Sequence, residues 1–85
     1  MEVSFAPAFS RQLQKLETAL QQETIETIDL LRNKENYRAL EVHKLNGRMA
    51  ERYSASVNYK YSIVFKYLSN TEVVLLAVGD HDVYK

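Results

Sequence analysis

The side chains best suited to chemistry lie near the end of the chain, where His81 and Tyr84 follow Gly79 and Asp80. Histidine accepts and donates a proton near neutral pH, so it often serves as a general acid or base. A glycine at the end of an apolar strand pattern puts His81 in a loop, where functional residues often lie. Two interpretations stay open from residue types alone: a catalytic pair, or a loop histidine beside a tyrosine that serves packing.

The second half of the chain also holds cations that could bind a phosphate. Residues 43–85 carry six Lys or Arg and four Asp or Glu, whereas residues 1–42 carry five and seven. The eleven basic and eleven acidic side chains cancel, so no broad nucleic-acid-binding surface is indicated. Any polyanion site is expected to be a local patch in the C-terminal half. Arg52 is a candidate for it, and a solvated surface arginine is the competing interpretation.

Composition bounds the class of protein. Its 85 residues, 46% hydrophobic and 26% charged, predict one globular domain over residues 1–85. The chain has no cysteine, which excludes disulfides, thiolate metal sites and cysteine nucleophiles. His43 is expected to be an exposed strand or turn residue. The two histidines have no further metal ligands at a suitable spacing, so we expect no metal site and no cofactor. Without an apolar run of roughly 20 residues or a signal-peptide pattern, we expect a soluble cytoplasmic protein.

The first half of the sequence predicts a short strand and two helices. Val3 and Phe5 alternate with polar residues, and Pro7 then suits the first turn of a helix. The apolar face of that helix consists of Phe9, Leu13, Leu16 and Leu20. A second helix is expected across residues 21–32, joined to the first near residues 20–23. Its apolar stripe is expected to be Ile25, Ile28 and Leu31. Both stripes should face the core.

The second half of the sequence predicts strands. A short strand is expected within residues 40–45, before a turn at Asn46-Gly47. Residues 52–58 and 61–67 alternate between apolar and polar positions, and residues 73–78 are apolar on both faces, as in an interior strand. The predicted fold class is α+β. An N-terminal strand and a two-helix hairpin pack on an antiparallel sheet of about four strands.

Several segments resemble, in order and spacing, those of the RelE/ParE superfamily of toxins from bacterial type II toxin–antitoxin systems. They are residues 5–9, which lead into the leucine-rich helix, and residues 44–47, 53–58, 61–65 and 78–84. The resemblance covers nearly the whole chain and implies a single RelE-like toxin domain. It also implies a cognate antitoxin as partner. The implied activity is ribosome-dependent cleavage of mRNA or, for the ParE branch, inhibition of gyrase.

The resemblance also implies a reaction and a set of site residues. A 2′-hydroxyl attacks the adjacent phosphate, which requires a base, a cation near the phosphate and an acid at the leaving oxygen. His81 and Tyr84 match catalytic positions of the family. Where the family carries basic residues on its active face, this chain has Ser54, Ser56 and Ser62, which can hydrogen-bond to a phosphate but bring no charge. The remaining candidates for binding RNA phosphates are Arg52, Lys44, Arg48, Lys66 and Lys85.

Three functions are compatible with these residues. The first is a toxin that acts as a ribosome-dependent mRNA endonuclease, which His81 and Tyr84 favour. The second is a catalytically weak or inactive RelE-like binding module, and the third is a ParE-like gyrase inhibitor. The uncharged serines favour both of these alternatives. We predict the first function, with an antitoxin, the ribosome and mRNA as partners and no membrane association.

Overall fold

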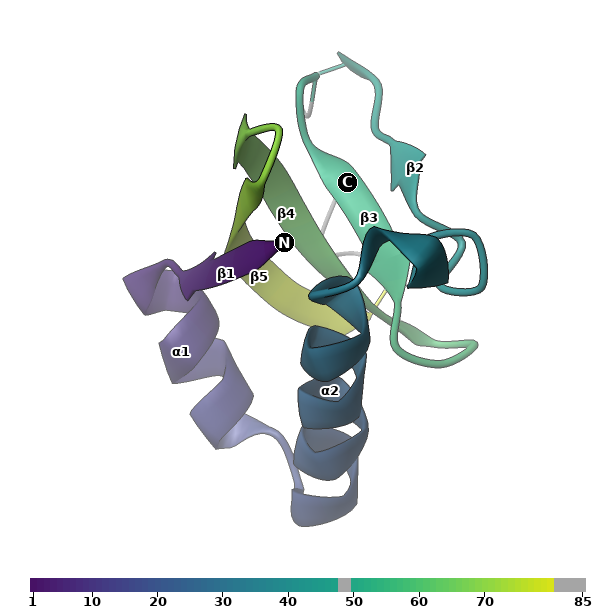
Figure 1. Ribbon diagram of the computed structural model, residues 1–85. Helices are drawn as coiled ribbons and strands as arrows, with labels where there is room; N and C mark the ends of the chain where they lie inside the picture. The colour runs from purple at the N-terminus through teal and green to yellow at the C-terminus, as the bar shows by residue number, and fades with distance from the viewer. Residues whose placement is uncertain (48–49, 81–85) are drawn as a thin grey trace.

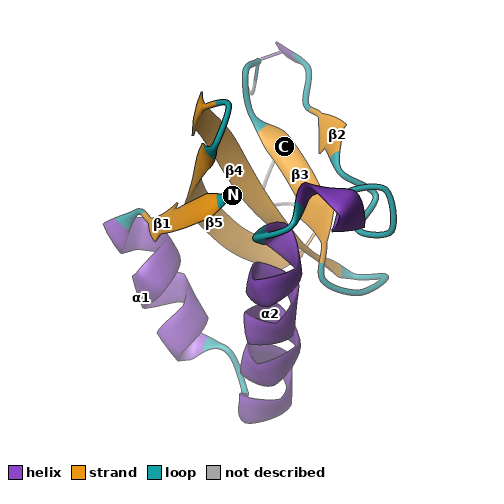
Figure 2. Ribbon diagram, viewed as in Figure 1, coloured by secondary structure: helices purple, strands orange, loops and turns teal. Residues whose placement is uncertain are grey.

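The computed structural model describes residues 1–47 and 50–80 (Figure 1, Figure 2). In chain order the elements are β1 (Glu2–Phe5), α1 (Pro7–Lys15), α2 (Thr18–Leu31), the 3₁₀ turn η1 (Lys34–Asn36), β2 (His43–Lys44), β3 (Tyr53–Ser56), β4 (Tyr61–Ser69) and β5 (Glu72–Asp80). This order confirms the predicted α+β class, with Pro7 opening α1. No helix within the described ranges is long and apolar enough to cross a membrane.

The strands of the described ranges form one sheet, in the order β1-β5-β4-β3-β2. The strands β2 to β5 make a meander of antiparallel pairs, as predicted. β1 adds a fifth strand beside β5 and runs parallel to it, with Val3 opposite Val73 and Phe5 opposite Leu75. The sheet is therefore mixed and has one strand more than predicted. Alternation along a sequence marks the two faces of a strand but carries no information on its direction.

The two helices join earlier in the chain than predicted. Leu16 and Glu17 are extended, with ψ of 149° and 158°. The Glu17 carboxylate accepts a hydrogen bond from the Leu20 amide (3.0 Å) and caps α2, so Leu20 belongs to α2 rather than to α1. Gln21 closes the corner, since its side chain donates to the Leu13 carbonyl (2.9 Å). From this corner the helices run in opposite directions and diverge as a V (Figure 1).

The buried face of α2 differs from the predicted stripe. Ile28 and Leu31 are buried as predicted, but Ile25 is 42% exposed, and Thr24 and Thr27 are buried instead. Each threonine hydroxyl donates to the carbonyl four residues earlier, at 2.8 and 3.0 Å, so the helix itself satisfies the polar group. A pattern of apolar residues selects isoleucine rather than threonine for the buried face of a helix. The prediction that Ile25 faces the core was therefore wrong.

The core lies between the helices and one face of the sheet. Phe9 from α1 and Ile28 from α2 meet Phe65, Val73 and Leu75 from the sheet. β5 is an interior strand between β1 and β4, and α1 packs against it. This arrangement confirms the prediction that residues 73–78 form an interior strand.

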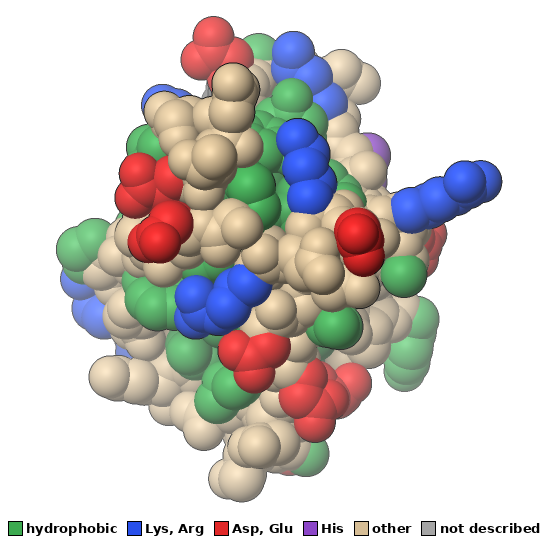
Figure 3. Space-filling model, in the orientation of Figure 1, with side chains coloured by type: hydrophobic (Ala, Val, Ile, Leu, Met, Phe, Trp, Pro, Cys, Tyr) green, Lys and Arg blue, Asp and Glu red, His purple; other side chains and the backbone are tan. Residues whose placement is uncertain are grey.

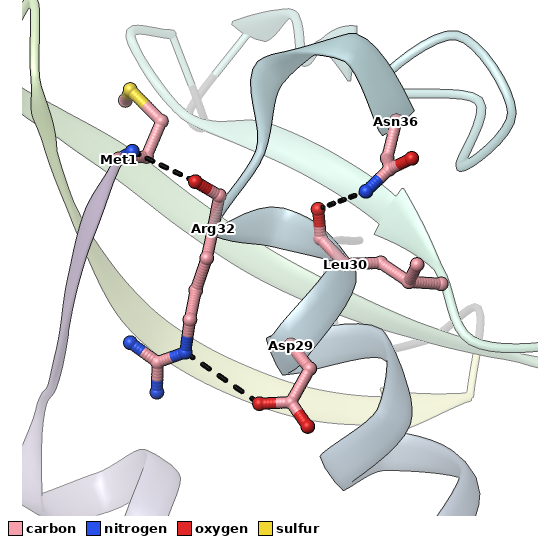
Figure 4. Close-up of polar contacts among 5 residues, drawn as sticks. All are labelled: Met1, Asp29, Leu30, Arg32 and Asn36. Atoms are coloured by element: carbon pink, nitrogen blue, oxygen red, sulfur yellow. Dashed lines mark hydrogen bonds and ion pairs between the residues drawn. The ribbon is translucent and has the colours of Figure 1, made fainter.

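Polar contacts fix the end of α2 against β1 and η1 (Figure 4). The Met1 ammonium donates to the Arg32 carbonyl (2.8 Å), and the Asn36 side chain donates to the Leu30 carbonyl (2.9 Å). Arg32 also forms an ion pair with Asp29 at 3.6 Å, which contributes little because both side chains are exposed. The Asn36 hydrogen bond holds η1 against the end of α2, and the Met1 bond holds the start of the chain there.

The hydrogen bond between Gln12 and Val78 provides a test of how α1 is fastened to the sheet. The Gln12 side-chain oxygen accepts from the Val78 amide (2.9 Å), on the part of β5 beyond its pairing with β1. Gln12→Ala should leave this partly buried amide unpaired and lower the free energy of unfolding by about 1–3 kcal/mol, measured by urea denaturation. Gln14→Ala removes an exposed side chain from the same helix and should change it by less than about 0.5 kcal/mol. An equal loss in both variants would contradict this role of Gln12.

Candidate functional site

The face of the sheet opposite the helices carries the three serines that the sequence places at expected basic positions. Side chains alternate along a strand, and Ala55 and Ile63 face the helical core. Ser54, Ser56 and Ser62 therefore project from the other face, which we call the open face. Ser56 and Ser62 are paired directly across β3 and β4. The structure thus brings the three serines together on neighbouring strands.

These serines line a cleft of about 180 Å³, which we call the serine cleft. Its lining residues are Glu41, His43, Ser54, Ser56, Asn58, Tyr59 and Ser62. Ser54 and Ser62 are only 2% and 5% exposed and so lie at its base, whereas Tyr59 is 92% exposed at its rim. The volume is below the roughly 300–1,000 Å³ of sites for drug-sized ligands. It suits a small group such as a phosphate or a sugar hydroxyl.

His43 lies in the serine cleft, although the sequence pattern gave it no role. Its backbone pairs with Ser54 across β2 and β3, so the two side chains project from the same face. Its Nδ1 lies 2.9 Å from the Glu41 carbonyl oxygen. A carbonyl oxygen can only accept a hydrogen bond, so this contact puts the proton of a neutral imidazole on Nδ1. The lone pair is then on Nε2, which can act as a base.

The contact to His43 comes from a residue with an uncommon backbone conformation. Glu41 has a φ of 54°, in the left-handed region that residues other than glycine seldom adopt. Such a conformation costs on the order of 1–3 kcal/mol, so the surrounding structure must enforce it. Two backbone hydrogen bonds close this turn: the Glu41 amide donates to the Arg38 carbonyl (3.1 Å), and the Val42 amide donates to the Tyr37 carbonyl (3.0 Å). The turn thereby fixes the carbonyl that orients the ring.

Side-chain hydrogen bonds shape the turn between β3 and β4. The Ser56 hydroxyl donates to the Asn58 carbonyl (2.9 Å). The Asn58 side-chain oxygen accepts from the amides two and three residues later, at 2.8 Å each. The single proton of Ser56 is therefore used within the fold. Ser54 and Ser62 are left as the serines whose hydroxyls could donate to a bound phosphate.

Three of the cations proposed from the sequence lie among the described residues, and none of these three lines the serine cleft. Lys44 pairs with Tyr53 and therefore belongs to the opposite face. Lys66 projects from the open face but pairs with Val74, farther along β4. Arg52 is exposed just before β3. On the side of the molecule in Figure 3, basic side chains are interspersed with acidic ones, in keeping with the zero net charge.

Four residues of the predicted site lie outside the described residues: Arg48, His81, Tyr84 and Lys85. Their roles stay predictions. Within the described ranges, no group of three or more His, Cys, Asp or Glu side chains is arranged to hold a metal ion.

No family model matches the sequence, and no curated protein is significantly similar to it. Solved structures, in contrast, match nearly the whole fold. The toxin–antitoxin complex RelBE2 from Mycobacterium tuberculosis gives a TM-score of 0.77 at 23% identity, over 94% of this chain and 96% of that chain. The archaeal RelE–RelB complex from Pyrococcus horikoshii gives 0.72 at 21%, over 93% and 92%. The YoeB/ParE toxin from Agrobacterium tumefaciens gives 0.76 at 13%, over 95% and 99%.

The chain therefore has the fold of the RelE, YoeB and ParE toxins. Two helices cover one face of a five-stranded mixed sheet, and the other face carries the serine cleft.

Proposed function

We propose that this protein is the toxin of a toxin–antitoxin system and that it cleaves mRNA on the ribosome. The fold match supports the toxin role, because it extends over 93–94% of the chain to proteins solved as toxin–antitoxin complexes. The observation that carries the chemistry is the serine cleft, in which His43 and Ser54 lie side by side on paired strands.

The proposed reaction is an attack of the 2′-hydroxyl on the adjacent phosphate. The 2′-oxygen forms a bond to phosphorus, and the bond from phosphorus to the 5′-oxygen of the next nucleotide breaks. A base removes the 2′-proton, and an acid returns a proton to the leaving 5′-oxygen. We assign the base to Nε2 of His43. The acid is assigned to His81, with Tyr84 alongside, from the family resemblance. The Ser54 and Ser62 hydroxyls donate to the phosphate oxygens.

The charge that develops on the phosphate also requires a cation. Among the described residues, no Lys or Arg lines the serine cleft. Lys66 projects from the open face and Arg52 is exposed just before β3, and we assign one of them to the phosphate of bound RNA. The cation-free lining also favours a second candidate function, a catalytically weak or inactive binding module with the same fold.

The partner we propose is a cognate antitoxin. RelE of Pyrococcus horikoshii and RelBE2 of Mycobacterium tuberculosis were each solved as a toxin–antitoxin complex. By analogy, a small protein encoded beside this chain should bind it and block the serine cleft or the approach to the ribosome.

The purified chain is expected to cut a reporter mRNA on programmed ribosomes and to leave gyrase supercoiling unchanged. The upstream fragment should end in a 2′,3′-cyclic phosphate, because the attacking group is the neighbouring hydroxyl. Adding the co-expressed neighbouring protein should suppress cleavage. Loss of supercoiling without mRNA cleavage would contradict the nuclease function and support a ParE-like gyrase inhibitor. If neither activity is found, the inactive binding module is the function that remains.

A further inference from the structure

A second cleft, of about 470 Å³, opens between η1 and the turn that joins β4 to β5. Its lining residues are Lys34, Tyr53, Tyr67, Leu68, Ser69 and Asn70, and we call it the tyrosine cleft. Tyr53 and Tyr67 pack against the core on the helix-covered face of the sheet, so this cleft shares no residue with the serine cleft. Its volume falls within the roughly 300–1,000 Å³ typical of small-molecule sites.

Aromatic rings form one wall of the tyrosine cleft. The rings of Tyr53 and Tyr67 meet edge to face, with centroids 4.9 Å apart and an interplanar angle of 89°. Tyr53 also stacks on Phe65 at 5.8 Å, and Phe65 is fully buried. Because the core holds both tyrosines, their exposed parts form a rigid surface on which a flat ligand can stack at little entropic cost.

The tyrosine cleft is also rich in hydrogen-bond donors. The Lys34 ammonium lies 5.6 Å from the centroid of the Tyr67 ring and, within the described part of the chain, forms no ion pair. Burial and, as a smaller effect, the nearby Tyr53 raise the pKa of Tyr67, so its hydroxyl keeps its proton. Ser69 and Asn70 add polar groups, and no acidic side chain of the described residues lines this cleft. Such a site is complementary to an anion that carries a flat ring.

We propose that the tyrosine cleft binds the nucleoside-phosphate unit of a nucleotide, with the base against Tyr53 and Tyr67 and the phosphate on Lys34. Lys34 rests over the Tyr67 ring in the free protein. A cation–π contact is weak at an exposed site, so the ammonium can move to a phosphate and uncover the ring for the base. The Asn70 amide offers both a donor and an acceptor to a base edge.

The position of Lys34 is fixed by its own segment. The Asn33 side chain accepts from the Glu35 amide (3.0 Å) at the start of η1, and the Asn36 side chain donates to the end of α2 (Figure 4). The backbone that carries the lysine is therefore held in place while its flexible side chain can reach the ligand.

Nucleotide binding here goes beyond the proposed cleavage and does not depend on it, because the two clefts use different residues on different faces. A free nucleotide and single-stranded RNA present the same unit. An acidic protein segment is a poorer match, since its carboxylates would pair with Lys34 but leave the tyrosine wall uncovered.

Titration of the ¹⁵N-labelled chain with uridine 5′-monophosphate is expected to shift the amide signals of Lys34 and of residues 67–70. A fluorescent six-residue oligouridylate measures affinity for the polymer by anisotropy. Lys34→Gln should weaken nucleotide binding about tenfold, the size of one charge-assisted hydrogen bond to a phosphate. Tyr67→Phe, which keeps the ring, should weaken it less.

Lys60→Gln is the matched control, because Lys60 lies over the Tyr61 ring at 5.7 Å in the same kind of contact but outside the tyrosine cleft. It should leave the shifts of residues 67–70 unchanged. If the oligouridylate binds more tightly than uridine 5′-monophosphate, the natural ligand of the tyrosine cleft is RNA. If the two bind with equal affinity, the natural ligand is a free nucleotide. Shifts that avoid residues 67–70, or an unchanged affinity in Lys34→Gln, would overturn the proposal. So would shifts of these signals by oligoglutamate but not by the nucleotide.

Discussion

Leu75→Asp is expected to abolish cooperative unfolding of the chain. Leu75 is 0% exposed and pairs with Phe5 of β1 on one side and Phe65 of β4 on the other. A carboxylate at this position would have no partner in an apolar core, which costs several kcal/mol. Small domains have about 5–15 kcal/mol of stability in total, and a chain this short lies near the lower end. The single charge should therefore remove most of the folding free energy.

Thermal unfolding followed by circular dichroism measures the effect. Leu75→Ala should retain a transition but lose about 2–5 kcal/mol. Leu68→Asp is the matched control, because Leu68 lies in neighbouring β4 and is 52% exposed. It should unfold cooperatively near the melting temperature of the parent. A normal melting curve for Leu75→Asp would show that the residue does not lie in the core.

The elements of the fold that follow from local pattern were predictable. Residues 61–67 and 73–78 have the alternating and the continuous apolar patterns of strands, and both form strands in the meander. The hydrophobic pattern failed where local side-chain hydrogen bonds determine the structure. The corner between the helices depends on a glutamate cap, because Glu17 begins α2 directly after Leu16 ends α1, without a glycine or proline. Ile25 is exposed because Thr24 and Thr27 are buried on this helix instead, and their hydroxyls donate to carbonyls of the same helix.

The candidate sites were also predictable only in part from the sequence. The alternation of residues 52–58 was enough to place Ser54 and Ser56 on one face, and the register then adds Ser62. His43 could not be placed, because β2 has only two residues and shows no periodicity. Its link to Ser54 exists only in the pairing with β3. The tyrosine cleft is equally invisible in the sequence, since Lys34 and Tyr67 are 33 positions apart and meet only after the sheet and η1 have formed.

His43→Ala is expected to reduce ribosome-dependent cleavage by about 10²–10⁴-fold, the usual contribution of a general acid or base. His43 lines the serine cleft, and its Nδ1 contact to the Glu41 carbonyl leaves Nε2 as the basic nitrogen. His81→Ala should cause a loss of the same order, because the reaction needs both a base and an acid. The double variant should lose less than the product of the two effects, since groups that act as a unit are not additive.

His43→Asn separates proton transfer from a structural role. The asparagine amide can still donate to the Glu41 carbonyl, so the turn should stay intact and the melting temperature should match that of the parent. An amide cannot take up the 2′-proton, so cleavage should fall as far as in the alanine variant. Full activity in His43→Asn, with loss only in His43→Ala, would show that His43 supports the cleft without entering the reaction. Full activity in both would remove it from the site.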